Sequence, residues 1–239
     1  MSKSPINLQS QPYTTSPETG LKDHFKGVSV LDNGYWNAFY KQGQVAEAPS
    51  NFAHFCQQQM FNQRRLNLFE AGCGNGRDAQ FFNAMKHTVT ALDQSEEVIK
   101  ANHNKQHANQ QKVNYTAGDF VTHLNSCSDQ FDIIYSRFTM HAISSSQQDK
   151  FLVACLGALK VGGKLCIEVR TIHDELYGVG RELGDNAFYS DHYRRFIDPS
   201  EFKTYVDSSK WQPIFFNEAR GYAPFGDEDP LILRVILEK

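Results

Sequence analysis

Three glycines at alternate positions, Gly72, Gly74 and Gly76, follow an apolar run that ends in the acid Glu70. Glycine adopts positive φ at little cost, and without a Cβ it lets a ligand approach the backbone. The stretch LNLFEAGCGNGRDAQFF, residues 66–82, therefore predicts a strand that turns into a helix beside a bound molecule, with a ligand-free tight turn as the alternative. A G-x-G-x-x-G spacing would favour a dinucleotide diphosphate, but the spacing here is G-x-G-x-G. The acid before it favours a ligand with an ammonium or another positive group.

Polar residues also stand at the ends of later apolar runs, where parallel strands would bring them to one edge of a sheet. Asp93 ends HTVTALD, and its carboxylate is either a ligand contact or a solvated acid at a strand end. Asp119 follows KVNYTAG and is either a ligand contact or the cap of the next segment. Ser136 and Arg137 close FDIIYSR, and Arg137 either holds a ligand carboxylate or pairs with an acid.

His141 is the first candidate for a general base, because a neutral imidazole titrates near working pH. It follows the fourth apolar run, so a second substrate at that strand end would meet it. The competing interpretation is an ordinary histidine in the helix after the strand. His192, in a later insertion, is the second catalytic candidate.

Apolar runs that alternate with helical periodicity position these residues. Strands are predicted at 66–71, 87–93, 112–120, 131–138 and 164–170, and helices at 77–86, 96–107 and 148–160. This alternation predicts βαβ units and a parallel sheet covered on both faces. Caps are expected from Ser95, from Ser146 with Asp149, and from the pair Gly162 and Gly163 as a helix stop.

The C-terminal part departs from this alternation. Asp198 and Pro199 begin another helix, because proline suits the first helical position. The runs WQPIFFNEARG and PLILRVILEK then follow each other without a helix between them. They predict a terminal hairpin and one antiparallel strand at the end of the sheet.

The stretch FEAGCGNGRD resembles motif I, E/D-x-G-x-G-x-G, of class I S-adenosylmethionine-dependent methyltransferases. Asp93, AGDF, FDIIYSRF and LKVGGKLCIEV follow in the family's order, with Val161 in place of proline. The resemblance covers about residues 50–239 and implies an α/β, Rossmann-like fold: a doubly wound, mostly parallel seven-stranded sheet with a C-terminal antiparallel hairpin strand and an N-terminal helical lid. It also implies S-adenosyl-L-methionine as cofactor, with Asp119 taking the adenine amino group and the Phe120 backbone reading the ring edge. The expected cofactor contacts are Trp36, Tyr40, Glu70, Gly72, Gly74, Asn75, Gly76, Asp93, Gln94, Asp119, Phe120, Ser136 and Arg137.

Residues 170–198 form an insertion that is long for a loop after a strand. Loops beyond about 12–15 residues are usually functional or disordered, and this one is rich in arginine, histidine and aromatic residues. We expect it to cover the substrate through Arg170, Tyr177, Tyr193 and Arg194. Arginine favours a bidentate grip on carboxylate or phosphate, which predicts an acidic acceptor. The alternative is that Arg194 and Arg195 pair with local acids such as Asp191 and Asp198.

Residues 1–20 have the composition of a flexible tail, and residues 21–50 are expected to form a lid segment before the domain at 51–239. GYWNAFYK places Trp36 and Tyr40 four apart on one helix face, and aromatic rings attract cations such as a sulfonium. This helix is similar to the one over the cofactor in tellurite- and thiopurine-methyltransferase-like enzymes. Rings that only anchor the helix are the alternative. YWNAFYK also resembles a segment of enzymes that methylate cytosine in tRNA.

The bulk composition restricts the class of protein. The formal charge of −3 gives none of the basic excess typical of nucleic-acid binding, so no nucleic acid is expected as a partner. Five cysteines without a CxxC motif favour free thiols in a reducing compartment, with no metal site. No long apolar run and no secretory signal are found, which predicts a cytoplasmic protein without a membrane association.

The predicted function is methyl transfer from S-adenosylmethionine to a small, acidic acceptor. An oxygen nucleophile is preferred, because a base candidate lies near the fourth strand. A sulfur acceptor, a glycan or a nucleotide-linked sugar stays open, as does the oligomeric state. The alternatives are a tRNA cytosine methyltransferase, transfer of another group from the same cofactor, and a cofactor-binding protein without methyl transfer.

Overall fold

The computed structural model describes residues 34–38, 40, 46–61, 64–106 and 111–239. The tail expected at 1–20 and most of the lid segment expected at 21–50 lie outside the described residues. Residues 34–38 and 40 are helical, as the spacing of Trp36 and Tyr40 predicts. No helix in the described part of the chain is long and apolar enough to cross a membrane.

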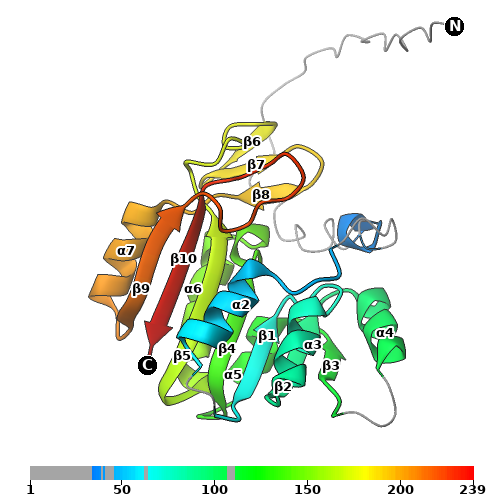
Figure 1. Ribbon diagram of the computed structural model, residues 1–239. Helices are drawn as coiled ribbons and strands as arrows, with labels where there is room; N and C mark the ends of the chain where they lie inside the picture. The colour runs from blue at the N-terminus through cyan, green and yellow to red at the C-terminus, as the bar shows by residue number, and fades with distance from the viewer. Residues whose placement is uncertain (1–33, 39, 41–45, 62–63, 107–110) are drawn as a thin grey trace, which may run out of the picture.

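A seven-stranded sheet forms the centre of the molecule, in the order β3-β2-β1-β4-β5-β10-β9 (Figure 1). Its strands are β1 (Asn67–Ala71), β2 (Thr88–Asp93), β3 (Asn114–Ala117), β4 (Phe131–Arg137), β5 (Leu159–Arg170), β9 (Gln212–Ala219) and β10 (Ile232–Glu238). Strands β1 to β5 are parallel, and β10 runs antiparallel to β5 and β9. The predicted doubly wound sheet with a C-terminal hairpin is confirmed.

The antiparallel strand lies one place in from the edge of the sheet, and not at the end as expected. Six of the seven residues of β10 are buried, whereas β9 exposes several residues and contains Pro213. Proline cannot donate to a neighbouring strand and is confined to edge strands and irregular positions. The apolar strand therefore lies between β5 and β9.

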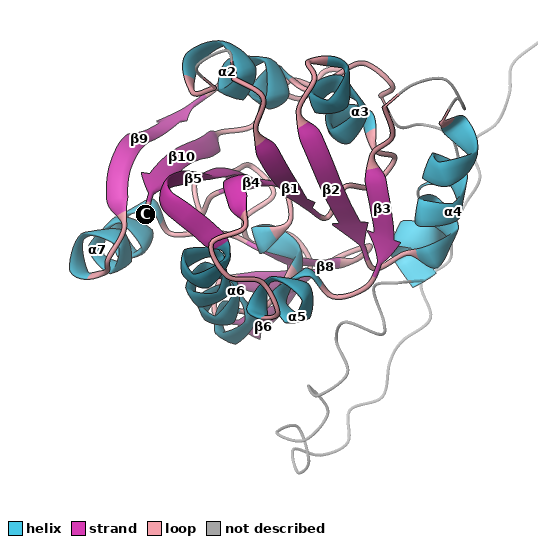
Figure 2. Cartoon of the chain, turned by 90° about the horizontal axis from the view of Figure 1, so that it is seen from below, coloured by secondary structure: helices cyan, strands magenta, loops and turns pink. Residues whose placement is uncertain are grey.

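Helices cover both faces of the sheet (Figure 2). They are α2 (Asn51–Gln59), α3 (Arg77–Ala84), α4 (Glu96–Lys105), α5 (Phe120–Asn125), α6 (Ser145–Ala158) and α7 (Pro199–Ser208), with a short 3₁₀ turn, η2 (Met140–Ala142). Neighbouring strand residues face opposite cores: Phe69 packs with α5, α6 and α7, and Leu68 packs with α2, α3 and α4. This burial on both faces explains the continuous apolar runs of the parallel strands.

Helix caps are partly as predicted. Ser95 caps α4 by accepting from the Val98 amide at 3.2 Å, and Asp198 caps α7. The predicted capping box of Ser146 and Asp149 is wrong, because α6 begins earlier: Ser144 forms the box with Gln147. The predicted glycine stop is also wrong, since α6 ends at Ala158 and the glycine pair lies within β5.

The insertion folds into a small antiparallel sheet above the carboxyl ends of β4 and β5 (Figure 1). Its strands are β6 (Arg181–Gly184), β7 (Ala187–Tyr189) and β8 (Tyr193–Arg195). Asp185 and Asn186 connect the first two strands with positive φ at both positions, as a tight hairpin turn requires. Arg195 fixes this sheet to the core, because its Nε donates to the carbonyl oxygen of Ile143 at 3.1 Å. The predicted loop is therefore an ordered substructure.

Candidate active site

The glycine turn lies at the carboxyl end of β1 and requires its glycines for two reasons. Gly74 and Gly76 have φ of 51° and 75°, a region that favours glycine. A Cβ on Gly74 would also overlap the hydroxyl of Tyr40, and one on Gly76 would overlap that of Tyr115. The turn therefore has no room for side chains at these two positions, and Tyr40 packs on it from the N-terminal helix.

Glu70 is a buried carboxylate whose charge is not compensated. Its side chain is 4% exposed, and its Oε2 has no hydrogen-bond partner among the described residues. Burial raises the pKa of Glu70 well above the ordinary value, and the Asp78 carboxylate raises it further, against the opposing effect of Arg77. Asp78 is itself satisfied by Ser50 and Tyr135. An unpaired buried acid is costly, so Glu70 fits a cationic group of a ligand.

Asp93 closes β2 next to the glycine turn. Its Oδ2 accepts from the Gly74 amide at 2.9 Å, and its Oδ1 accepts from the Ser95 amide at 3.0 Å. Burial raises the pKa of Asp93, and these backbone hydrogen bonds oppose the shift. A carboxylate offers about four lone-pair positions, so the two hydroxyls of a ribose still find acceptors there.

Asp119 and Phe120 lie at the end of β3. Asp119 caps α5, since its Oδ1 accepts from the Thr122 amide at 2.7 Å. This is the capping role that the sequence left open beside ligand binding. The Phe120 ring is buried in the core, so only its backbone is placed to meet a ligand.

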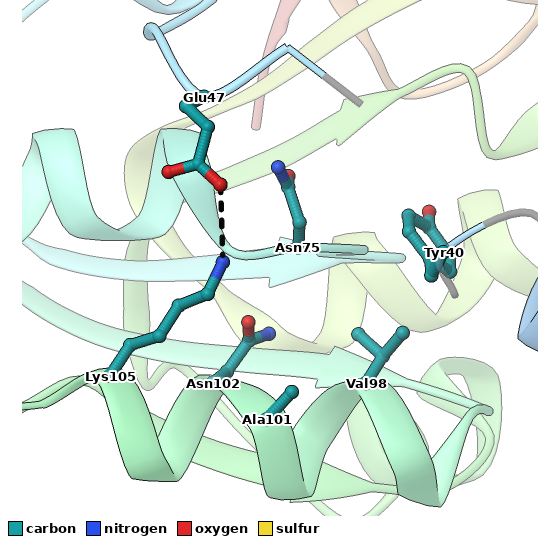
Figure 3. Close-up of a pocket in the computed structure, with 7 residues that line it drawn as sticks. All are labelled: Tyr40, Glu47, Asn75, Val98, Ala101, Asn102 and Lys105. Atoms are coloured by element: carbon teal, nitrogen blue, oxygen red, sulfur yellow. Dashed lines mark ion pairs between the residues drawn. The ribbon is translucent and has the colours of Figure 1, made fainter. Parts of the chain in front are cut away.

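A hollow of about 190 Å³ lies beside the glycine turn (Figure 3). Its lining residues are Tyr40, Glu47, Asn75, Val98, Ala101, Asn102 and Lys105. Asn75 donates to the Ala46 carbonyl at 3.0 Å, and Asn102 donates to the Gly74 carbonyl at 2.8 Å, so both amides hold the turn in place. Glu70, Asp93 and Asp119 are not among the lining residues. The hollow therefore adjoins the acids at the strand ends and does not contain them.

The N-terminal helix contacts the insertion across this edge. Tyr35 stacks on His192 with ring centroids 4.2 Å apart, and Trp36 meets the same imidazole edge-on at 5.4 Å. Tyr35 also donates to Asp191 Oδ2 at 3.1 Å. Trp36 and Tyr40 lie 6.3 Å apart, as their helical spacing predicts. Two segments that are distant in the sequence thus meet at the carboxyl edge of the sheet.

Arg137 belongs to a buried network that sequence reasoning missed. Its Nε donates to Glu168 Oε1 at 2.8 Å, and Arg234 Nε donates to Glu168 Oε2 at 2.7 Å. The register explains this arrangement, because Glu168 on β5 stands opposite Arg137 on β4 and opposite Arg234 on β10. Of the two roles considered for Arg137, pairing with an acid is the one observed. Burial raises the pKa of Glu168, and the two guanidinium groups oppose the shift.

Phe138, which sequence reasoning also missed, follows directly after β4. It has φ of 57°, a strained value for a residue with a side chain, and its amide donates to the Glu168 carbonyl at 2.8 Å. The Arg137 guanidinium lies 4.3 Å from the ring centroid and that of Arg170 lies 6.0 Å away. The ring also stacks with His141 at 5.4 Å. Phe138 therefore brings two arginines and the candidate histidine together.

His141 is buried in η2, and its Nδ1 has no hydrogen-bond partner among the described residues. Burial lowers the pKa of His141 well below the ordinary value, and the Arg170, Arg194, His192 and Arg137 groups lower it further. The imidazole is therefore neutral at pH 7. Ser136, at the end of β4, likewise has a buried Oγ without a partner in the described part of the chain.

The basic residues of the insertion differ in how they are paired. Arg170 Nη1 lies 2.7 Å from Asp174 and Arg170 Nη2 lies 3.6 Å from Glu228, whereas Arg194 approaches Asp191 only to 3.9 Å. Burial lowers the pKa of Arg194, and Arg170 lowers it further. His192 Nδ1 lies 3.0 Å from Asp191 Oδ1 but is not aligned for a hydrogen bond, and burial lowers its pKa.

The two expected tyrosines of the insertion lie in or against the small sheet. The Tyr177 ring packs edge-on against Phe188 and Phe196 at 5.1 and 5.6 Å, within the small sheet's own aromatic cluster. Tyr193 is buried in β8. Pairing of Arg195 with Asp198 is wrong, because Arg195 bonds Ile143 and Gln148, and Asp198 caps α7.

The structure brings the glycine turn, Glu70 and Asp93 to one site. A second group gathers at the neighbouring strand ends and consists of Arg137, His141, Arg170 and Arg194. Of the remaining expected residues, Gln94 follows Asp93 directly, and Gly72 has φ of 68°. Within the described residues, no group of three or more His, Cys, Asp or Glu side chains could hold a metal ion.

Comparison with known proteins gives one family match. Residues 68–163 match the family described as "Methyltransferase domain". This region runs from β1 to the start of β5 and contains the glycine turn, Asp93, Asp119 and His141. No curated protein sequence matches the chain.

Many solved structures share the fold. The Burkholderia thailandensis 1,6-didemethyltoxoflavin-N1-methyltransferase, with 1,6-didemethyltoxoflavin and S-adenosylhomocysteine bound, is 16% identical with a TM-score of 0.65, over 95% of this chain and 93% of that one. A structure described by the conversion of a disulfide bond into a thioacetal group during echinomycin biosynthesis is 17% identical with a TM-score of 0.64, over 89% and 91% of the two chains. An S-adenosylmethionine-dependent methyltransferase from Mesorhizobium loti is 14% identical with a TM-score of 0.61, over 80% and 98%. At these identities the likeness concerns the fold.

Proposed function

We propose that the chain is a class I S-adenosylmethionine-dependent methyltransferase whose acceptor is a small molecule that carries a negative charge. The observation that carries this proposal is the group of basic side chains around His141. Arg137 and Arg170 flank the Phe138 ring, and Arg194 lies near the same imidazole with one distant acid at 3.9 Å. Basic groups in this position suit a carboxylate, phosphate or other anion.

The residues at the strand ends fit the cofactor. Glu70, with its unpartnered Oε2, suits the α-ammonium group of the methionine part, and Asp93 suits the ribose hydroxyls. We assign the second oxygen of Asp119 and the Phe120 backbone to the adenine. S-Adenosylmethionine bound there supplies an activated methyl group on its sulfonium sulfur.

The chain's own residues then orient the acceptor and exclude water. The N-terminal helix and the insertion are far apart in the sequence, and they contact each other at this edge through Tyr35 and His192. Orientation of two reactants in this way contributes about 7–11 kcal/mol to catalysis in favourable cases. We propose Arg170, Arg194 and Tyr193 as the acceptor-facing residues of the insertion, with His141 and His192 beside the reacting atom.

Two similar structures support a small-molecule acceptor, because one is named as the N1-methyltransferase of 1,6-didemethyltoxoflavin and the other is described by a conversion during echinomycin biosynthesis. These names do not select one acceptor atom for this chain, so the proposal keeps oxygen, nitrogen and sulfur. Free thiols at all five cysteines fit action in a reducing compartment such as the cytoplasm.

Methyl transfer from CD₃-labelled S-adenosylmethionine into a small-molecule extract tests the proposal. The expected product is a labelled small molecule whose unlabelled parent is acidic, identified by mass spectrometry and by its retention on an anion exchanger. An equal reaction with total tRNA serves as the comparison. Label found in tRNA and absent from the small molecules would refute the proposal.

A further inference from the structure

We infer that the acceptor binds as an anion whose negative charge lies on, or is conjugated with, the atom that receives the methyl group. The enzyme then needs no general base, and His141 acts as a neutral positioning group. This inference rests on the proposed function and names the acceptor class more narrowly. It covers thiolates, phenolates and carboxylates.

The imidazole of His141 lacks the support that a histidine base needs. A catalytic histidine base is normally held and supported by an acid that bonds its other ring nitrogen. His141 has no such acid: no hydrogen bond joins it to a carboxylate in the described part of the chain. Its described neighbours are the Phe138 ring and basic groups. An imidazolium formed here would be buried among cations without a counter-charge.

Charged groups face His141 from each surrounding element. The basic ones are Arg137 on β4, Arg170 at the end of β5, His192 just before β8 and Arg194 on β8. The acids nearby are already engaged. Glu168 is shared by Arg137 and Arg234, Asp174 and Glu228 lie on Arg170, and Asp191 lies beside Arg194 and bonds Tyr35. These acids lie against the arginines, and the charged groups that act on the imidazole itself are the basic ones, which also favour an ionised acceptor.

Phe138 is held in a strained conformation directly after β4. A non-glycine residue with φ of 57° is held there only because its surroundings over-determine it. Here the Phe138 amide bonds the Glu168 carbonyl at 2.8 Å, and the next residue, Thr139, donates to the Ala71 carbonyl at 2.8 Å. These bonds keep the ring between two guanidinium groups and the imidazole. The strained backbone thus keeps Arg137, Arg170 and His141 gathered around the Phe138 ring, where the acceptor is proposed to bind.

The chemistry balances without a proton transfer. A lone pair of the anionic acceptor atom forms the new bond to the methyl carbon, and the pair of the broken carbon–sulfur bond stays on sulfur. The acceptor loses its negative charge in this step, and the sulfonium loses its positive charge. The methylated product is no longer attracted to Arg170 and Arg194, which favours its release.

The test uses a matched series of 4-nitrophenyl acceptors with the full-length protein and CD₃-labelled S-adenosylmethionine. 4-Nitrothiophenol, 4-nitrophenol and 4-nitrobenzoate are wholly or partly ionised near neutral pH, 4-nitrobenzyl alcohol is neutral, and 4-nitrobenzylamine is cationic. We expect the ionised members to react at least about tenfold faster than the other two, a difference of about 1.4 kcal/mol. The rate with 4-nitrophenol should rise with its ionised fraction as the pH increases.

Three variants separate a positioning role from a base. His141→Asn, whose amide cannot take up a proton at working pH, should lower kcat but leave the pH profile set by the ionisation of 4-nitrophenol. Arg194→Gln should raise KM for the ionised members by about tenfold, with a smaller effect on the benzyl alcohol. Arg181→Gln is the matched control, because Arg181 is an exposed arginine on β6 of the same insertion.

The other possible results overturn either the inference or the proposed function. Equal or faster transfer to the benzyl alcohol or benzylamine, or loss of the pH-dependent rise in His141→Asn, overturns the inference and leaves the proposed function standing. No transfer to any member, with S-adenosylhomocysteine binding intact by calorimetry, also overturns it, because the series contains thiolate, phenolate and carboxylate nucleophiles. Absence of S-adenosylhomocysteine binding would instead refute the proposed function.

Discussion

Replacing Glu70 with glutamine should change the stability of the ligand-free protein and its affinity for the cofactor in opposite directions. Glu70 is 4% exposed, and its Oε2 has no partner among the described residues. Its pKa in the folded protein is raised above the ordinary 4.5, first by burial and then by Asp78. The native state therefore holds a proton that the unfolded chain releases, and stability falls as pH rises above about 4.5.

Glutamine removes this penalty. A pKa raised by one unit corresponds to about 1.4 kcal/mol, and 1 kcal/mol shifts the Tm of a chain of this size by about 2–4 °C. We therefore expect the ligand-free Glu70→Gln variant to melt higher at pH 8, by about 3–6 °C for each unit, with a flatter dependence of Tm on pH than the parent. Differential scanning calorimetry between pH 5 and 8 measures both quantities. Glu182→Gln, at an exposed acid on β6, is the control.

Cofactor binding should respond with the opposite sign. A hydrogen bond to a charged group contributes about 1.5–3 kcal/mol, so Glu70→Gln should weaken S-adenosylhomocysteine about 10- to 150-fold. 5′-Methylthioadenosine, which lacks the amino-acid part, should bind both proteins equally. In the parent, binding should release a proton from Glu70, so that affinity rises with pH by up to about tenfold per unit until the raised pKa is passed. Calorimetry in buffers of different ionisation enthalpy detects this proton. An unchanged Kd for S-adenosylhomocysteine, or a lower Tm of the ligand-free variant, would refute the role of Glu70.

Three further changes test the site and its support. Asp93→Ala should weaken S-adenosylhomocysteine and 5′-methylthioadenosine alike by at least about tenfold, since both contain the ribose; unchanged calorimetric affinities would rule out this contact. Gly74→Ala forces a Cβ onto the Tyr40 hydroxyl at φ 51°, whereas Gly178→Ala meets open space at φ 83°, so both should lose about 1–2 kcal/mol to backbone strain and only the first should also lose cofactor affinity. Equal cofactor affinities would contradict this. Glu168→Gln removes the acid shared by two buried arginines and should lower the free energy of unfolding by about 3–5 kcal/mol in urea titrations; a loss below 1 kcal/mol would mean that the network is relaxed or hydrated.

Local signals along the chain determined the class of fold and half of the site. The alternation of short apolar runs with helical periods predicts strands buried on both faces, and the described sheet has them. The glycine turn and the acids Glu70 and Asp93 were found because each depends on its immediate neighbours: a turn that needs positive φ, or an acid at the end of an apolar run. Helix caps were less secure. Ser144 competed with Ser146 only two residues away, and the geometry of a single turn decided between them.

Only the tertiary structure decided the acceptor side. Arg137, Glu168 and Arg234 are far apart in the sequence, and they meet because β5 lies between β4 and β10 in one register. A shift of that register by one residue would turn their side chains to opposite faces, and no local pattern specifies it. The composition of the insertion predicts a loop. In the structure it forms its own three-stranded sheet and bonds the segment after η2 through contacts such as Arg195 to Ile143. The neutral state of His141 has the same origin, because its pKa depends on burial and on basic groups that β5 and the β8 segment bring from distant parts of the sequence.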